Sequence, residues 1–250
     1  MKLQLGKLGA LGAVALSLIS ATSCAEVKTD LFIRGVSIVT VSGSACEYSQ
    51  SQTVLSGLMD VNLTTQFRIG VQVGSQLLET GNSDMLRPES NRVVIKGAEV
   101  HLLDEQGRLI EEFTVAATGF IDPTVTSEPT YGVAAFRVIP PQTGALLRDQ
   151  FINANPGQIN IIATFTVFGE TLGGSEIESA EYSWPITVCY GCAVYFPSEA
   201  MILDSTGRRF CGGEAESGDP PPCNAGSGSD VDCRTCRDIS YDDSLCLYPR

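Results

Sequence analysis

The chain has 250 residues and is strongly acidic, with 29 Asp and Glu residues against 16 Lys and Arg residues and a formal net charge of −13. An acidic surface repels nucleic acid and anionic lipid headgroups, so we expect no nucleic-acid partner. The length suffices for one large β domain, or for one domain with an appendage.

The first 23 residues have the order of an export signal. Lys2 and Lys7 give a positive start, and a mostly apolar run follows from Leu8 to Ile19. This run is shorter than the roughly 20 residues that a membrane-spanning helix needs. It fits the apolar region of a signal peptide, which the small residues Ala21 and Ser23 would close. We therefore expect this leader to be removed.

The sequence Ala21-Thr22-Ser23-Cys24 resembles the lipobox of bacterial lipoproteins, in which the leader is cut before the Cys and the Cys carries lipid. The resemblance implies lipidation at Cys24 and a tether over residues 24–28. Ala21 departs from the Leu that usually stands three places before the Cys, and an ordinary signal peptide with Cys24 in a disulfide is the alternative. Because Ala25 rather than Asp follows, the resemblance implies an outer-membrane anchor, with the protein facing the periplasm or the cell surface.

The body of the chain alternates apolar and polar residues with the period of two that is typical of β-strands. The clearest case is Val61 to Val73, which predicts one long strand with one face in a core and the other in water. Pro185 predicts an edge strand, because Pro cannot donate to a ladder. The other expected strands are Leu31–Val41, Arg92–Leu103, Arg108–Ala116, Tyr131–Ile139, Gln158–Gly169 and Ala180–Val188.

Seven strands separated by Gly, Ser, Asn and Pro clusters predict an all-β fold. We expect an antiparallel β-sandwich of immunoglobulin-like architecture over residues 29–188. Asp104 to Gly107 reads as a hairpin loop between two of the strands, and a short helix is expected within Gly144 to Ile152.

The cysteines are concentrated at the C-terminal end. Once Cys24 is set aside, eight remain, and an even number in an exported chain predicts up to four disulfides. Residues 189–250 are therefore expected to form an irregular appendage that crosslinks hold together. Cys46 is expected to pair with Cys189 or Cys192. The disulfide candidates are Cys46, Cys189, Cys192, Cys211, Cys223, Cys233, Cys236 and Cys246.

The C-x-x-C motifs and the single histidine have both a functional and a structural interpretation. Paired C-x-x-C motifs, starting at Cys189 and Cys233, can hold zinc, but disulfides fit an exported chain better. Neither motif is expected to precede a helix, as a thioredoxin-like redox motif would. His101 is the only histidine, and the sequence lacks the G-x-S-x-G motif of a serine nucleophile that a histidine base would activate. We therefore expect His101 to have a structural place on a strand.

Carboxylates and aromatic residues lead to the same expectation. Adjacent Glu111 and Glu112 should point to opposite faces of a strand, and the pair Glu176 and Glu178 is expected to be solvated surface. Trp184 and Tyr182 could stack on a sugar, but their spacing favours core positions. We expect no catalytic residue, metal or cofactor.

The whole chain resembles uncharacterised β-rich lipoproteins of Gram-negative bacteria, on the strength of the lipobox. That resemblance implies a non-enzymatic lipoprotein of the outer membrane with a binding, assembly or structural role and a partner protein in the envelope. A carbohydrate-binding surface lipoprotein and a hydrolase that uses carboxylates in a cleft are the alternatives.

Overall fold

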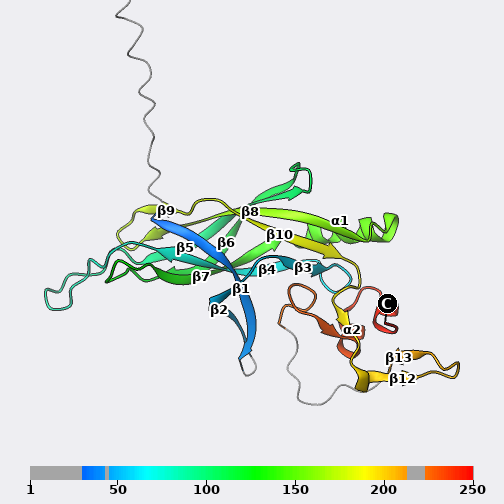
Figure 1. Cartoon of the computed structure of the whole chain (residues 1–250). Coiled ribbons are helices and arrows are strands. Elements are labelled where there is room, and N and C mark those ends of the chain that lie inside the picture. The colour runs from blue at the N-terminus through cyan, green and yellow to red at the C-terminus, as the bar shows by residue number, and fades with distance from the viewer. Residues whose placement is uncertain (1–29, 43–44, 213–222, 250) are drawn as a thin grey trace, which may run out of the picture.

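The computed structural model describes residues 30–42, 45–212 and 223–249 of the chain (Figure 1). The predicted leader, the tether and Cys24 lie outside these residues. Within the described ranges, no helix is long and apolar enough to cross a membrane.

Ten strands build the body, in the hydrogen-bonded order β2-β1-β4-β7-β6-β5-β8-β10-β3, with β9 beside β8. The expected all-β class is thereby confirmed, although the strand count of seven was too low. The strands are β1 (Leu31–Ser42), β2 (Ala45–Val54), β3 (Gly57–Asp60), β4 (Phe67–Ser75), β5 (Val93–Asp104), β6 (Leu109–Ile121), β7 (Thr130–Ile139), β8 (Gln158–Thr171), β9 (Glu176–Glu178) and β10 (Tyr182–Cys189).

The hydrogen-bonded series of strands forms two halves that face each other across the core. Strands β6 and β7 pair only at Thr118 and Ala135, so the hydrogen-bonded connection between the halves is narrow. Aromatic rings meet across the interior: the centroids of Phe136 and Phe165 lie 5.5 Å apart, and those of Phe67 and Trp184 lie 5.6 Å apart. Such edge-on contacts stabilise the packing beyond the area they bury.

Two expectations about single strands were wrong. The segment from Val61 to Gln66 is not strand, because its backbone turns around the end of β3: the N–H groups of Leu63 and Thr64 both donate to the carbonyl of Asp60. Strand β4 begins only at Phe67, and both of its faces are largely buried. Strand β10, which contains Pro185, lies between β8 and β3 rather than at an edge.

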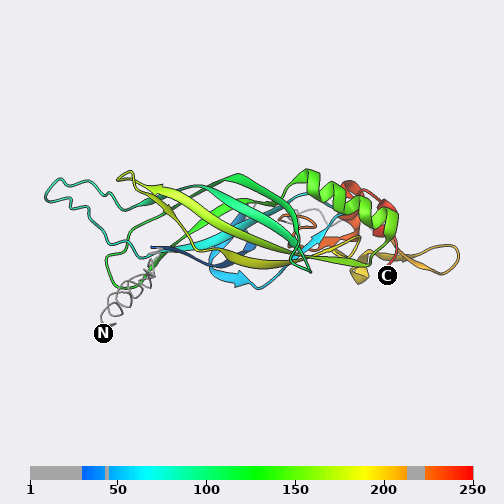
Figure 2. The same cartoon turned by 90° about the horizontal axis from the view of Figure 1, so that it is seen from above.

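One helix, α1 (Pro141–Ala154), follows β7 and confirms the expected helical segment. It starts with Pro141, which suits a first helical position. Gly144 lets the helix approach the loop before β4, because a Cβ there would lie 1.8 Å from the carbonyl oxygen of Thr65. Figure 2 shows α1 at the end of the molecule where the C-terminal region packs.

We call residues 190–249 the tail. It is built from short elements: β11 (Val194–Tyr195), η1 (Ser198–Ala200), β12 (Met201–Leu203), β13 (Arg209–Cys211), β14 (Val231–Asp232), α2 (Cys233–Ile239) and η2 (Asp243–Cys246). Strand β11 pairs with β14, and β12 pairs with β13. The tail is disulfide-rich, as expected, but it is more regular than the sequence suggested.

Strands β1 and β2 also form an arm that leaves the body. Strand β1 pairs with β4 only as far as Val36, and beyond that residue it pairs with β2 alone. We call residues 39–42 and 45–48 the arm. Figure 1 shows it bending away from the body toward the tail.

Candidate functional site

Two side chains at the end of β3 hold the tail against the body. The Asp60 carboxylate is fully buried and accepts three backbone N–H groups, from Asn62 at 3.0 Å, from Gly191 at 2.7 Å and from Ala193 at 2.9 Å. A buried carboxylate needs such donors, because an unpaired charge in the interior is very unfavourable. Asp60 therefore fixes the first turn of the tail directly after β10.

Asn62 holds a second, distant part of the tail. Its Nδ2 donates to the carbonyl of Asp242 at 3.2 Å, and its Oδ1 accepts the N–H of Asp242 at 2.7 Å. The carbonyl of Asn62 also accepts the N–H of Tyr241 at 2.8 Å. We call Asp60 and Asn62 the tail anchor. Two residues of one turn thus organise segments that lie about 50 positions apart in the tail.

A glycine-rich segment of the tail covers the free edge of β3. The N–H of Gly228 donates to the carbonyl of Leu58 at 2.9 Å, and the N–H of Asp60 donates to the carbonyl of Gly226 at 2.7 Å. Gly226 has a φ of +72°, and a Cβ there would lie 2.5 Å from the Cβ of Leu63. Only glycine fits this close approach, which satisfies edge groups that would otherwise be open to another chain.

All eight cysteines of the described residues are paired. The bonds are Cys46–Cys223, Cys189–Cys192, Cys211–Cys233 and Cys236–Cys246. The expected bond from Cys46 to Cys189 or Cys192 was wrong. Cys46 lies on the arm, which bends away from the end of β10, while Cys189 lies opposite Asp60 and closes the short loop that the Asp60 carboxylate binds.

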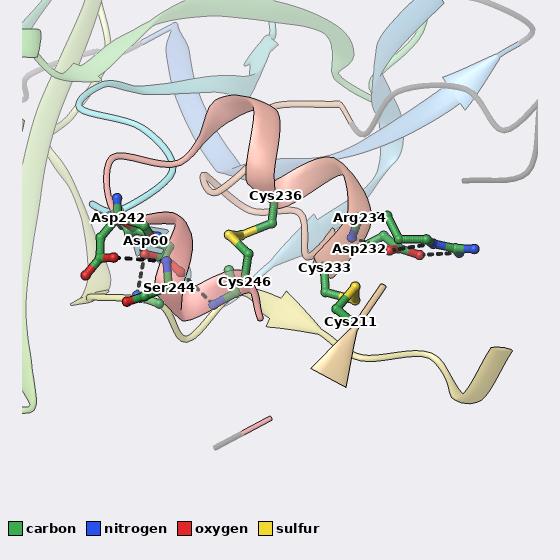
Figure 3. Close-up of a disulfide and its surroundings, with 12 residues drawn as sticks. Asp60, Cys211, Asp232, Cys233, Arg234, Cys236, Asp242, Ser244 and Cys246 are labelled. Carbon is green, nitrogen blue, oxygen red and sulfur yellow. Dashed lines mark hydrogen bonds and ion pairs between the residues drawn. A yellow bond between two sulfur atoms is a disulfide. The ribbon is translucent and has the colours of Figure 1, made fainter. Parts of the chain in front are cut away.

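The second C-x-x-C motif opens a helix, contrary to expectation. Cys233 and Cys236 lie on α2, but they bond to different partners, Cys211 and Cys246 (Figure 3). Asp232 caps this helix by accepting the N–H of Arg234, and its carboxylate also pairs with the Arg234 guanidinium at 2.6 Å. Hydrogen bonds from the Arg234 side chain lower the pKa of Asp232. The motif therefore crosslinks α2 to two other parts of the tail.

Body, arm and tail together enclose an apolar pocket of about 170 Å³, which we call the junction pocket. Strand β1 contributes Val36 to Val39, of which Val39 belongs to the arm, and the body also contributes Leu58, Phe67 and Trp184. The tail contributes Asn224, Ser227 and Gly228. Three other hollows of the described surface are more open to solvent.

The lining of the junction pocket also includes polar side chains, among them Ser37, Arg68 and Asn224. Ser37 is 4% exposed, and its hydroxyl has no hydrogen-bond partner within the described part of the chain. The indole Nε1 of Trp184 donates to the carbonyl of Val54 at 3.4 Å and is therefore occupied. Beside the pocket, Leu55 is 88% exposed at the connection from β2 to β3. Leu55 therefore adds one exposed apolar side chain next to the pocket.

The pocket's size limits what it can hold. A cavity of about 150 Å³ accommodates a benzene ring, whereas pockets for drug-sized ligands occupy about 300–1,000 Å³. The junction pocket therefore suits one aromatic or branched aliphatic side chain, with Ser37 available for one hydrogen bond. It is too small for an oligosaccharide.

Trp184, which also lines the junction pocket, is 2% exposed, and Tyr182 packs against the core, as expected. The carboxylate candidates lie away from the junction pocket. Glu111 accepts a hydrogen bond from Thr143 of α1, and Glu112 lies on the other face beside His101.

Sequence reasoning missed the roles of Asp60 and Asn62. The signal for them was the run Asp60-Val61-Asn62, in which polar residues interrupt an apolar stretch at the start of a turn.

Glu176 and Glu178 are exposed on β9, as expected.

No protein-family model matches this sequence, and no curated protein matches it. Among solved structures, a similarity is found to AggA, the major subunit of the type I aggregative adherence fimbriae of Escherichia coli. The identity is 14%, the match covers 53% of this chain and 87% of AggA, and the TM-score is 0.23. A likeness at this level supports no conclusion about this chain.

Proposed function

We propose that this protein is an exported lipoprotein of the bacterial envelope, anchored in the outer membrane through lipid on Cys24, with a non-catalytic binding or assembly role. The observation that carries the proposal is the pairing of all eight remaining cysteines into four disulfides. Such a complete set forms and persists in an oxidising compartment outside the cytosol. Cys24 stays outside these pairs and follows the predicted leader, which leaves it for lipid.

The junction pocket supports the binding role. Its lining is mainly apolar, its volume matches a single side chain, and the exposed side chain of Leu55 lies beside it. Burying one large apolar side chain stabilises a complex by about 1.5–3 kcal/mol, which is typical of a central contact in a protein interface. A partner protein that inserts such a side chain is the binding mode that the geometry favours.

The two alternatives have less support. The aromatic residues that suggested a sugar platform, Trp184 and Tyr182, belong to the core. A hydrolase needs convergent carboxylates in a cleft, and no Asp or Glu is found among the described residues that line the junction pocket.

Membrane fractionation tests the anchor. Cys24→Ala should move the protein from membranes to the aqueous fraction and abolish labelling with palmitate, because the acyl chains supply the affinity for the bilayer. The matched control is Ala25→Asp. It keeps the lipidated Cys, should still be labelled, and should by resemblance shift the protein to the inner membrane. A Cys24→Ala protein that remains in the membrane fraction would disprove the anchor.

Photocrosslinking in native membranes tests the binding role. A photoreactive residue at Leu55 should capture a specific partner, whereas the same residue at Leu146 on α1, which is 65% exposed, should not. A variant that fills the pocket should block the partner. A larger residue at Gly57 would disturb Trp184 and the core, so we choose Ser37→Leu, which fills the pocket from β1. This substitution should abolish the crosslink from position 55. Equal crosslinking from Leu55 and Leu146 would count against the junction pocket.

A further inference from the structure

Three carboxylates surround the only histidine on the outer face of the sheet. His101 and Glu99 are two positions apart on β5, so their side chains emerge on the same face. Glu112 lies directly opposite His101 on β6, and Glu181 precedes β10. The imidazole Nε2 lies 3.9 Å from Glu99 and 3.9 Å from Glu112, and its Nδ1 lies 4.0 Å from Glu181.

The two sides of the imidazole have different surroundings. Nε2 faces Glu99 and Glu112, and Nδ1 faces Glu181 alone. Metal-ligating histidines bind the ion through one nitrogen and donate the other N–H to a carboxylate, carbonyl or water. At 4.0 Å, Glu181 makes no hydrogen bond with Nδ1 but lies near enough to accept one after a small movement of its side chain.

No basic side chain other than the imidazole lies beside these carboxylates. Among the described residues, no Lys or Arg forms an ion pair with Glu99, Glu112 or Glu181. Carboxylates 4 Å from one imidazole repel one another, and a divalent cation relieves that repulsion.

We propose that Glu99, His101 and Glu112 bind a divalent transition-metal ion such as Zn²⁺, and that Glu181 orients the imidazole. The ligand atoms of the first three residues all lie within 4.8 Å of one another. Zinc bonds of about 2.0–2.2 Å place neighbouring tetrahedral ligands about 3.4 Å apart, so the carboxylates must close by an ångström or so. Their side chains are 54% and 56% exposed, which leaves them free to do this.

The ligand set selects among metals. Imidazole nitrogen suits zinc, copper, iron and nickel, while magnesium and calcium prefer oxygen ligands alone. Three protein ligands leave one tetrahedral position open toward solvent. Water fills it in the isolated protein, and a ligand group of another molecule can replace that water. The ion would join β5 to β6 on the face of β5 that is more exposed to solvent, and it would lie outside the junction pocket.

Isothermal titration of the purified full-length protein in detergent, with disulfides intact, tests the site. Zn²⁺ should bind at one ion per chain. His101→Gln should weaken binding at least 100-fold, Glu99→Gln and Glu112→Gln about tenfold each, and Glu181→Gln about tenfold through the orienting contact. Glu176→Gln changes an exposed carboxylate on β9 and should bind as the parent does. Mg²⁺ should give no heat.

The imidazole NMR signals give a second readout, because only one histidine contributes. They should shift on addition of one equivalent of Zn²⁺, and a Trp184 fluorescence spectrum like that of the parent shows that each variant is folded. The proposal is overturned if the parent binds no zinc, if His101→Gln binds it as tightly as the parent, or if the imidazole signals do not move.

Discussion

Replacing Asp60 is the sharpest test of how the tail is held to the body. Asp60→Ala removes the acceptor of three buried backbone N–H groups, those of Asn62, Gly191 and Ala193. Each buried donor left unpaired costs about 1–3 kcal/mol, so we expect a loss of about 4 kcal/mol in the free energy of unfolding, at the upper end for one substitution. Asp60→Asn should lose about 2 kcal/mol, because its amide retains one acceptor oxygen but turns an NH₂ group toward one donor.

Urea unfolding under non-reducing conditions measures these losses. Trp184 is the only tryptophan and is 2% exposed, so its fluorescence reports the core directly. The matched control is Asp149→Asn, which neutralises an exposed carboxylate on α1 and should change stability by less than about 0.5 kcal/mol. If Asp60→Ala unfolds within about 1 kcal/mol of the parent, the buried network does not hold the tail and the reasoning fails.

Three further predictions concern separate parts of the chain. Replacing both Cys46 and Cys223 by Ser opens a link across 177 positions and should cost about 4 kcal/mol in urea unfolding; an unchanged midpoint would refute it. Burial raises the pKa of Glu89, but backbone hydrogen bonds lower it more, from 4.5 to about 2. The ionised Glu89 should therefore stabilise the 80–91 loop above pH 4.5, and this stabilisation should be lost as the pH falls toward 2. Amide hydrogen exchange in the loop should rise in that pH window, and the Glu89→Gln variant should lack this dependence. Gly144→Ala places a Cβ against the Thr65 carbonyl and should lower the thermal midpoint by several degrees; a parental midpoint would show that α1 can move away.

The parts of the fold that could be predicted from sequence are those with strong local patterns. Strand β8 alternates clearly and was placed within two residues of its end, and the hairpin at Asp104 has an obvious turn. Strand β2 was missed because its residues are polar and mostly exposed, so it lacks the apolar period of a core strand. Strand β3 has only four residues, too few for any period to show.

Long-range features could not be predicted, because they depend on how distant segments meet. The partner of Cys46 is set by the bend of the arm, which follows from where β1 leaves β4 and has no signature in the sequence. In the sequence, Asp60 looks like an ordinary turn residue, because its partners Gly191 and Ala193 lie far along the chain. Glu99 lies two positions from His101 on β5, but Glu112 and Glu181 come from two other segments, which a search for spaced motifs does not join.

Intact-mass spectrometry of the protein purified from its native envelope tests the central claim most directly. The account predicts a chain that begins at Cys24, carries covalent lipid there, and has its eight other cysteines in four disulfides. A mature chain without lipid, or one whose cysteines react as free thiols before reduction, would contradict it.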